Sequence, residues 1–389
     1  MKPLDGKKIL LGVSSGIAAY KIPNLVRKLR KEGATVHVIL TENAEYLVSK
    51  KVLEVLSKNK VYSRLFGNGI DIPHIELLKE VDLFLIAPAT ANTIGKISNG
   101  IADDLISTIF LANKAPVIVC PSMNELMWKK ITVSTNVRRL RRYGIKILGP
   151  VKGEFACGSS GVGRLLKEDE IVEGCIDELT KKDLKKKKIL ITSGPTKEFF
   201  DPIRYISNSS SGKTGYNIAK KAALRGADVI LVNGAKDLPQ SKLFKQKKVV
   251  TAKDMQREVQ NQIGEADVFI SVAAVSDFKP VNYSSEKIKK ENIGFSFNME
   301  LNIDILKSVS SEKRSDQIFI GFALETENMF ENAQKKMIEK NLDYIVINKP
   351  FNLGSDTGSY QIYGKDNHYS TFENISKADF ADKLLDLVR

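Results

Sequence analysis

The sequence is poor in the features that define several common protein classes. Its 389 residues contain only three cysteines, Cys120, Cys157 and Cys175, which are too few for a disulfide framework and lack the spacing of a metal site. No apolar run approaches the roughly 18 residues that a membrane span needs. Residues 1–8 lead directly into a strand-like segment, so we expect no signal peptide. These absences predict a protein of the reducing cytoplasm that has no membrane partner.

The composition is otherwise that of an ordinary globular protein. Hydrophobic residues make up 42% and charged residues 27% of the chain, values that exclude the disordered, collagen-like and coiled-coil classes. At about 150 residues per domain, the length predicts two or three domains, each able to bury a core.

The net charge is the unusual feature. Lys and Arg outnumber Asp and Glu by 60 to 46, which gives a net charge of +14. Such a charge favours an anionic partner: nucleic acid, a membrane surface or phosphorylated small molecules. Most of the cations are Lys, whereas Arg is the better base-reading residue, so specific DNA recognition is disfavoured. A solvated Lys-rich surface is the plainer interpretation.

Strand-like and helix-like segments alternate in two successive blocks. The first block has strand patterns at 8–13, 35–40, 81–87 and 117–120 and a helical pattern at 16–32. The second has strand patterns at 188–192, 228–232, 266–273, 317–323 and 343–347 and helical patterns at 213–226 and 328–340. This alternation predicts parallel sheets in two different α/β domains. Because the charged run 180–188 indicates a linker, we expect domains at 1–182 and 183–389.

Three loops of the first domain have compositions that suit an anionic ligand. Residues 12–16 (GVSSG) join a strand to a helix, where unsatisfied N–H groups attract phosphate, although the spacing is not the dinucleotide fingerprint. The small residues at 87–92 follow a buried strand, at the edge where open α/β sheets place ligands. Asn124 follows the next strand, and its amide can donate to a carboxylate. Plain turns, helix caps and packing are the alternatives.

Two side chains of the first domain are candidates for chemistry. Of the three histidines, His37 alternates inside a strand and His368 belongs to a polar segment. His74 instead follows a proline in a loop, which makes it a candidate general base or carboxylate partner. Cys157 lies in a Gly-rich segment that indicates a mobile lid, and this favours a chemical role over packing.

The second domain offers a polar helix entry and an acidic strand end. Residues 207–214 read SNSSSGKT, but a P-loop needs Gly at position 207, so we predict an anion-binding helix entry of another kind. Asp277 follows a buried strand and suits Mg²⁺ that a nucleoside triphosphate carries. Lys287 belongs to a Lys-rich run that fits phosphates or a solvated surface.

Five motifs of the first domain occur together in one known family. They are residues 12–21, 73–75 (PHI), 88–104 (PATANTIGKISNGIADD), 121–128 (PSMNELMW) and 156–165 (ACGSSGVGRL). In this order they resemble the flavin-dependent cysteine decarboxylases, which implies a flavodoxin-like flavoprotein domain with bound FMN. The resemblance implies cofactor contacts from Gly12, Ser14, Ser15, Gly16, Thr41, Pro88, Ala89, Thr90 and Asn92. Its implied substrate and catalytic residues are Met123, Asn124 as carboxylate ligand, His74 as base or orienting group, and Cys157 as proton donor.

Five segments of the second domain resemble another known family. They are 192–215, 271–280, 286–290, 321–328 and 340–348, and they are similar to phosphopantothenate–cysteine ligases. The resemblance implies a Rossmann-like ligase domain that uses CTP and Mg²⁺ and forms an acyl-cytidylate. Its implied CTP contacts are Asp277, which also holds the metal, Lys287, Asn302, Ile303, Asp304, Ile305, Phe322, Lys336 and Lys340. The resemblance also implies that Asn208 acts on the acyl-cytidylate, with Arg204 nearby. The family usually has Pro at position 303, so Ile303 makes this loop less rigid.

The whole chain is similar to bifunctional enzymes of coenzyme A biosynthesis. The resemblance implies ligation of 4′-phosphopantothenate with cysteine, followed by decarboxylation of the product to 4′-phosphopantetheine. It also implies a homo-oligomer, a dodecamer with trimers of the flavin domain and dimers of the ligase domain. An FMN decarboxylase of peptide C-terminal cysteines is an alternative, and the second domain argues against it. A nucleic-acid-binding protein is another, and it would need basic motifs interleaved with aromatics, which the sequence lacks.

Overall fold

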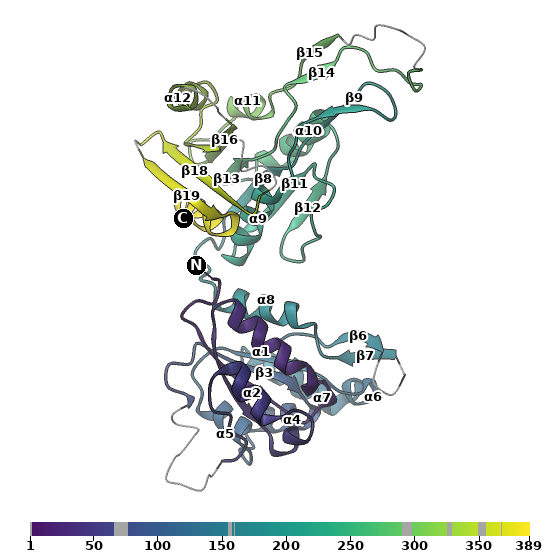
Figure 1. The fold of residues 1–389 in the computed structure, drawn as a ribbon, viewed down its shortest axis with the longest axis vertical. Coiled ribbons are helices and arrows are strands. Elements are labelled where there is room, and N and C mark those ends of the chain that lie inside the picture. Colours follow the sequence, from purple (N-terminus) through teal and green to yellow (C-terminus); the bar gives the residue numbers. More distant parts are fainter. Residues whose placement is uncertain are drawn as a thin grey trace. The chain divides into compact units, whose positions relative to one another are not determined.

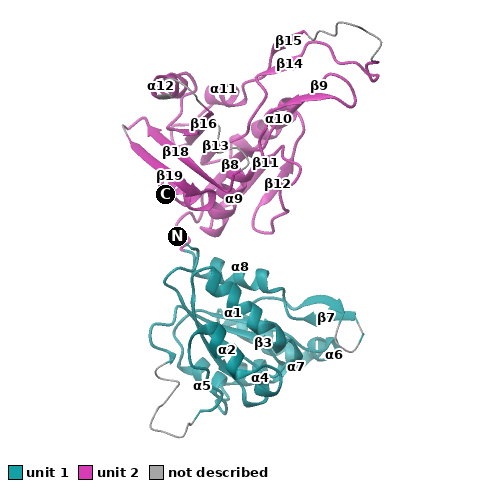
Figure 2. Cartoon of the chain, viewed as in Figure 1, with its two compact units in different colours: residues 1–180 teal, residues 181–389 magenta. Residues whose placement is uncertain are grey.

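The chain folds into two compact units, Met1–Thr180 and Lys181–Arg389 (Figure 2). The computed structural model describes residues 2–65, 77–154, 158, 160–289, 298–324, 329–348, 355–366 and 368–389. Across these ranges, no helix combines the length and the apolar character that a membrane crossing requires.

Unit 1 is built on a five-stranded parallel sheet in the order β2-β1-β3-β4-β5. The strands are β1 (Lys8–Val13), β2 (Thr35–Leu40), β3 (Leu83–Ala89), β4 (Val117–Pro121) and β5 (Lys146–Ile147). Strands β3 and β4 are buried along their whole length. This is why the sequence shows them as continuous apolar runs instead of alternating patterns.

Helices cover both faces of this sheet. Helices α1 (Ile22–Lys31), α2 (Lys50–Ser57) and α8 (Glu168–Leu179) share one apolar core with Ile9, Leu11 and Val13 of β1. Helices α4 (Ala91–Asn99), α5 (Leu105–Ala112) and α7 (Ile131–Arg142) share the other core with Leu10. The order and the two helical layers are flavodoxin-like, and the predicted α/β class is confirmed.

The carboxyl edge of this sheet has an opening between β1 and β3. The strand order reverses there, because β2 pairs with one side of β1 and β3 pairs with the other. Such a switch point at the carboxyl ends of the strands is the usual ligand site of open α/β sheets. The short helix α6 (Glu125–Lys129) follows β4 at the same edge, and the antiparallel strands β6 (Val151–Glu154) and β7 (Ser160–Arg164) pair with each other.

Unit 2 contains an eight-stranded sheet in the order β12-β11-β8-β13-β16-β17-β18-β19 (Figure 1). Its parallel part comprises β8 (Lys188–Ser193), β11 (Asp228–Asn233), β12 (Lys245–Lys248), β13 (Val268–Ser271), β16 (Ile318–Leu324) and β17 (Tyr344–Asn348). Strands β18 (Thr357–Gly364) and β19 (Tyr369–Ser376) extend it as an antiparallel hairpin. The prediction of a mostly parallel sheet is confirmed.

Two helical layers and two small hairpins complete unit 2. Helices α9 (Lys213–Leu224) and α13 (Lys377–Leu385) pack on one face, and α10 (Ala252–Ile263), α11 (Ile305–Ser310) and α12 (Met329–Glu339) pack on the other. The hairpins are β9 (Lys197–Phe199) with β10 (Tyr205–Ser207), and β14 (Phe278–Pro280) with β15 (Met299–Leu301). Both follow carboxyl ends of the main sheet, after β8 and β13 respectively.

Some element ends differ from the sequence expectations for identifiable reasons. The helical pattern at 16–32 is the short 3₁₀ helix η1 (Ile17–Lys21) followed by α1, because Pro23 is tolerated only in the first turn of an α-helix. Strand β3 covers Leu83–Ala89 instead of 81–87. Helix α9 ends at Leu224, and Gly226 then takes a φ of +95° that turns the chain away.

The charged run after residue 180 is anchored in unit 2. Leu184 is fully buried in the core that β8 and α9 share, and its N–H donates to the Arg225 carbonyl oxygen over 3.0 Å. The carboxylate of Asp183 accepts two hydrogen bonds from the Arg225 guanidinium, over 2.9 and 3.0 Å. One apolar side chain suffices for this anchoring because neighbouring Lys side chains can keep their ammonium groups in water.

Candidate functional site

A wide pocket lies at the carboxyl edge of the unit 1 sheet and has about 1660 Å³ of open space. Its described lining comes from η1 and the residues before it, from the start of α4, from the β4–α6 connection and from β6 and β7. Six of the residues predicted for cofactor or substrate line it: Ser15, Gly16, Thr90, Asn92, Met123 and Asn124. Loops that are far apart in the sequence therefore meet at the β1/β3 switch point.

Ser14 fastens two of these loops together. Its side chain is fully buried, and its hydroxyl donates to the Pro88 carbonyl oxygen over 2.7 Å and accepts from the Thr90 N–H over 2.9 Å. The pocket lining includes Ser15 and not Ser14. The structure thus makes Ser14 a fixing point between the loops after β1 and β3.

Small residues allow close packing around this fixing point. A Cβ on Gly12 would lie 3.3 Å from the Phe84 ring, so the glycine lets the sheet pack tightly where β1 ends. A Cβ on Gly16 would lie 3.4 Å from the Thr90 methyl group. Ala89 is fully buried at the end of β3. Gly16 thus lines the pocket itself, whereas Gly12 and Ala89 allow close packing at the strand ends beneath the loops.

Thr41 supplies an unsatisfied polar group. It follows β2, and its N–H donates to the Val13 carbonyl oxygen over 3.0 Å. Its hydroxyl is buried and has no hydrogen-bond partner among the described residues. Because buried polar groups are normally paired, the orphaned hydroxyl fits a bound group with acceptor oxygens at this edge of the sheet.

Asn124 presents its amide donors to the pocket. It caps α6, and its Oδ1 accepts from the Leu126 N–H over 2.8 Å. This bond fixes the orientation of the amide, and within the described ranges its Nδ2 group makes no hydrogen bond. The donors are thus available to a carboxylate, as the sequence predicted.

The β6–β7 hairpin docks beside Asn124. The Val162 N–H donates to the Glu125 carboxylate over 3.2 Å, and the Met123 N–H donates to the Gly163 carbonyl oxygen over 2.9 Å. Glu154 and Arg164 of the hairpin also line the pocket, although neither is among the residues predicted from the sequence. Cys157 and His74 lie outside the described residues.

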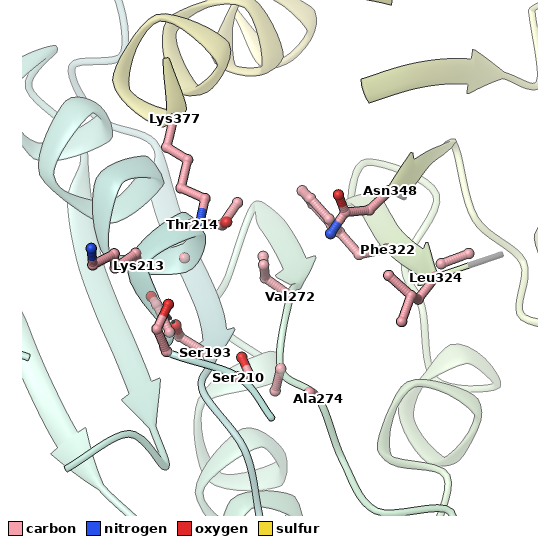
Figure 3. Close-up of a pocket in the computed structure, with 15 residues that line it drawn as sticks. Ser193, Ser210, Lys213, Thr214, Val272, Ala274, Phe322, Leu324, Asn348 and Lys377 are labelled. Atoms are coloured by element: carbon pink, nitrogen blue, oxygen red, sulfur yellow. Dashed lines mark hydrogen bonds between the residues drawn. The ribbon is translucent and has the colours of Figure 1, made fainter. Parts of the chain in front are cut away.

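Unit 2 has its own pocket at the carboxyl ends of β8, β13, β16 and β17, with about 690 Å³ of open space (Figure 3). Its lining residues are Ser193, Ser210, Ser211, Gly212, Lys213, Thr214, Gly215, Val272, Ala273, Ala274, Phe322, Ala323, Leu324, Asn348 and Lys377. Phe322 is the predicted CTP contact among them. The pocket therefore combines a Ser/Gly-rich helix entry with apolar strand ends.

Helix α9 is pressed closely onto β8 at this pocket. Ser193 donates its hydroxyl to the Gly212 carbonyl oxygen over 2.8 Å. A Cβ on Gly215 would lie only 2.5 Å from the Ser193 oxygen, and Gly212 caps the helix with a φ of +70°. The first N–H groups of α9 receive no side-chain cap, so they face the pocket as donors.

Two lysines line this pocket and have different orientations. Lys213 points away from the pocket in Figure 3, and its ammonium pairs with the Asp356 carboxylate over 2.7 Å. Lys377, at the start of α13, points toward Thr214 in the first turn of α9, and the residue is only 4% exposed. Burial lowers the pKa of the Lys377 ammonium, and the charge of Lys213 acts in the same direction. Lys377 is thus the better placed cation for an anion at the α9 terminus.

Other predicted ligase residues lie in smaller groups beside the β9–β10 and β14–β15 hairpins. Asn208 donates its amide to the carbonyl oxygens of Ala274 and Val275, over 3.2 and 2.9 Å. Asn302 and Ile303 line a separate cavity, and the Asn302 amide donates to the Ser276 carbonyl oxygen over 3.0 Å. The Asn302 N–H also donates to the Asp277 carbonyl oxygen over 2.8 Å. Asn302 and Asn208 are therefore both held by the connection that follows β13.

Four further predicted residues lie near α11 and α12. Asp304 caps α11, Ile305 begins that helix and is buried, and the Lys340 ammonium pairs with the Asp304 carboxylate over 2.8 Å. Lys336 lies in α12, and Lys340 follows it by about one turn, directly after the end of the helix. The structure thus joins Asp304 to Lys340 and places none of these residues in the pocket of Figure 3.

The metal prediction rests on one carboxylate. Asp277 is exposed, and its carboxylate has no hydrogen bond or ion pair within the described part of the chain. The described residues contain no cluster of three or more His, Cys, Asp or Glu side chains that could hold a metal ion. A single free carboxylate fits Mg²⁺ that arrives with phosphate oxygens, because Mg²⁺ needs few protein ligands.

Both units match known protein families. The model of the Flavoprotein family matches residues 1–180, and that of the DNA/pantothenate metabolism flavoprotein C-terminal domain matches residues 184–389. Two-unit relatives include the coenzyme A biosynthesis bifunctional protein CoaBC of Bacillus subtilis, 40% identical over 98% of this chain and 96% of the relative. The CoaBC protein of Escherichia coli K12 is 43% identical over 89% of this chain and 86% of the relative.

A solved structure of a CoaBC C-terminal domain covers 52% of this chain and 94% of that domain, with 37% identity and a TM-score of 0.46. The fold and the family matches define a two-unit α/β flavoprotein of pantothenate metabolism. The chain belongs to the family of bifunctional coenzyme A biosynthesis proteins, CoaBC.

Proposed function

We propose that unit 2 joins 4′-phosphopantothenate to cysteine with CTP and that unit 1 decarboxylates the product to 4′-phosphopantetheine. The observation that carries the proposal is the meeting of Ser15, Thr90 and Asn124 in one pocket at the switch point of a flavodoxin-like sheet. We assign the first reaction, the ligation, to the pocket of unit 2 at α9. All substrates of both steps are anionic or zwitterionic, which suits the net charge of +14.

In unit 2 the reaction begins with activation of a carboxylate. The carboxylate oxygen of 4′-phosphopantothenate attacks the α-phosphorus of CTP, and pyrophosphate leaves. We assign the phosphates to the N–H groups of the 210–215 segment and to Lys377, whose ammonium faces the first turn of α9. Asp277 would hold the Mg²⁺ that the nucleotide brings, and the ion would neutralise phosphate charge. Lys287, Lys336 and Lys340 add positive charge from neighbouring segments.

The second step in unit 2 transfers the acyl group. The amine of cysteine attacks the acyl carbon of the acyl-cytidylate, the amide bond forms and CMP leaves. The Asn208 amide is held by two carbonyl oxygens beside β13, so its Oδ1 has a fixed direction. We assign to this oxygen the orientation of the cysteine ammonium group before it loses its proton.

In unit 1 the residues fit FMN. Thr41 has the orphaned hydroxyl, Gly16 leaves space that a Cβ would fill, and Ser15 offers a hydroxyl at the pocket wall. These residues would hold the phosphate, while Pro88, Ala89, Thr90 and Asn92 would border the ring. When bound, the flavin supplies a reversible two-electron oxidation of the substrate thiol, which makes loss of CO₂ possible.

The protein groups of unit 1 bind, orient and protonate. The Asn124 Nδ2 group binds the carboxylate that will leave, because its donors face the pocket and its Oδ1 is already bonded. We assign substrate orientation to His74 and the proton delivered to the decarboxylated carbon to Cys157. The hairpin strands that flank position 157 in the sequence line the pocket, which supports a covering role for this segment.

Exposed apolar side chains on both units support the proposed oligomer. In unit 1 Ile17, Leu126 and Ile131 are 62%, 72% and 71% exposed. In unit 2 Ile203 and Leu301 on the hairpins are 58% and 77% exposed. Burial of these side chains between copies is expected to be favourable. We propose flavin-domain trimers and ligase-domain dimers, assembled as a dodecamer in the cytoplasm.

Two variants separate the two reactions. Asn208→Ala is expected to accumulate the acyl-cytidylate, because activation survives and transfer to cysteine slows. Cys157→Ser is expected to complete ligation and to accumulate an oxidised, decarboxylated product that lacks the final proton. Mass spectrometry of quenched reactions distinguishes these species. Normal turnover by either variant would reject the role assigned to that residue.

A further inference from the structure

Asp201 is a fully buried carboxylate in the turn that joins β9 to β10. Its Oδ1 accepts from the N–H groups of Ile203 and Arg204, over 2.8 and 2.7 Å. The Arg204 guanidinium lies 3.4 Å from its Oδ2. The side chain therefore shapes the turn and sets the direction in which Arg204 leaves it.

The second oxygen of Asp201 reaches a distant segment. Oδ2 accepts from the Ile288 N–H over 3.3 Å, and Ile288 directly follows Lys287. The Ser284 N–H donates to the Phe200 carbonyl oxygen over 3.0 Å, so two bonds tie this segment to the β9–β10 hairpin. Lys287 itself is exposed, and its backbone is held through its neighbour.

This use of both oxygens exceeds what the turn requires. An Asx-type turn needs one acceptor oxygen, which Oδ1 supplies alone. A buried carboxylate is costly unless its oxygens are bonded, and here the oxygen that the turn does not need is bonded to the segment that carries Lys287. The arrangement thus connects Arg204, which the resemblance places near the acyl-transfer residue Asn208, with Lys287, which is assigned to nucleotide binding.

We propose that Asp201 is a positioning residue that fixes Arg204 and Lys287 relative to each other, so that one carboxylate aligns the activation and transfer steps of the ligase. The inference rests on the proposed ligase function. It assigns no contact between Asp201 and substrate. The effect passes through backbone N–H groups of the two segments.

Asp201→Asn tests this proposal with little change in shape. The Asn Oδ1 can keep both turn bonds, which leaves the amide NH₂ facing the Ile288 N–H, donor against donor. The variant should therefore keep the turn and release the Lys287 segment. Loss of a charge-assisted bond at this place predicts a rise of about tenfold in the KM for CTP. Slower consumption of the acyl-cytidylate by cysteine is also expected, because Arg204 loses its partner charge.

Hydrogen exchange at single amides gives a readout independent of activity. In Asp201→Asn, the Ile288 N–H should exchange faster than in the wild type, while those of Ile203 and Arg204 stay protected. Asp254→Asn is the matched control, since Asp254 belongs to the capping box of α10 and to no proposed site. It should leave the KM for CTP and the Ile288 exchange rate unchanged.

Ile288→Pro removes the same bond from its other side. It should raise the KM for CTP as Asp201→Asn does, and the double variant should be no worse than either single one. An unchanged KM in Asp201→Asn with a released Ile288 amide would overturn the proposal, and so would an unchanged exchange rate. A purely structural role would lower kcat through loss of folded enzyme and leave KM as it is. If the wild type ligates nothing with CTP, the proposed function fails, and the exchange data still decide whether the bond exists.

Discussion

The buried Ser14 hydroxyl accepts a hydrogen bond from the Thr90 N–H over 2.9 Å and so joins the loops that follow β1 and β3. Ser14→Ala would leave this N–H without its partner and remove the bond to the Pro88 carbonyl oxygen. We expect a loss of roughly 1–3 kcal/mol in unfolding free energy and a lower flavin content of the purified protein. Thermal unfolding and the ratio of flavin to protein absorbance measure the two effects.

Ser15→Ala is the comparison for this variant, because Ser15 lines the pocket and is exposed. It should lower flavin content with little change in stability. If Ser14→Ala were as stable as the wild type, the loops would not depend on this bond.

Two cysteines of unit 1, Cys120 and Cys175, are expected to be unreactive in the native protein. Cys120 and Cys175 are fully buried, and burial raises the pKa of both thiols, that of Cys175 to about 12. At pH 8 a thiol with such a pKa has a thiolate fraction on the order of 10⁻⁴. Iodoacetamide at this pH should leave both unmodified in the native protein and label both after denaturation, as peptide mass spectrometry would show. Rapid native labelling of either would contradict their buried placement.

Asp104 is expected to stabilise unit 1 in a pH-dependent way. It caps α5 through a capping box with Ser107 and pairs with the Lys96 ammonium over 2.8 Å. Burial acts to raise the pKa of the Asp104 carboxyl, but the bonds from Lys96 and Ser107 outweigh it and lower the pKa overall. The stabilisation is therefore present above the ordinary carboxyl pKa and is lost as the pH falls through the lower folded value.

Asp104→Ala should lower the unfolding free energy of unit 1 by about 1 kcal/mol at pH 7. The difference from the wild type should shrink below about pH 4. Trp128 is the single tryptophan of the chain and lies in unit 1, so its fluorescence in urea follows this unit. A difference that persists at low pH would show that the charge of Asp104 contributes nothing.

Lys377 is expected to bind the nucleotide. Lys377→Met keeps a long side chain in the buried position and removes the ammonium that faces α9. We expect the KM for CTP to rise about tenfold, because a charge-assisted contact to phosphate is lost. Lys383→Met, at an exposed position of the same helix, is the control and should behave as the wild type. Equal KM values for the two variants would remove Lys377 from the nucleotide site.

Local sequence patterns predict much of the fold. Buried parallel strands such as β3 and β4 appear as short apolar runs because both faces are covered. The ends of elements depend on single residues, as with Pro23 at the start of α1 and Gly226 beyond α9. The β18–β19 hairpin was not predicted, since its alternating pattern suits any half-covered strand.

The candidate sites, like the fold, could be predicted in part from local sequence patterns. Loops after β1, β3 and β4 carry recognisable small and polar residues, and six of their predicted members line one pocket. The Ser/Gly-rich segment before α9 was also predicted from its local sequence as an anion-binding helix entry. Lys377 gave no local signal, because only the tertiary fold brings α13 to that pocket. The roles of His74 and Cys157 stay predictions from the resemblance.

The most direct test combines both units in one reaction. The purified protein is incubated with 4′-phosphopantothenate, cysteine and Mg²⁺, with either CTP or ATP, and the products are identified by mass. With CTP we predict CMP, pyrophosphate, CO₂ and 4′-phosphopantetheine, and far less product with ATP. Absence of any phosphopantothenoylcysteine or phosphopantetheine with both nucleotides would contradict the account.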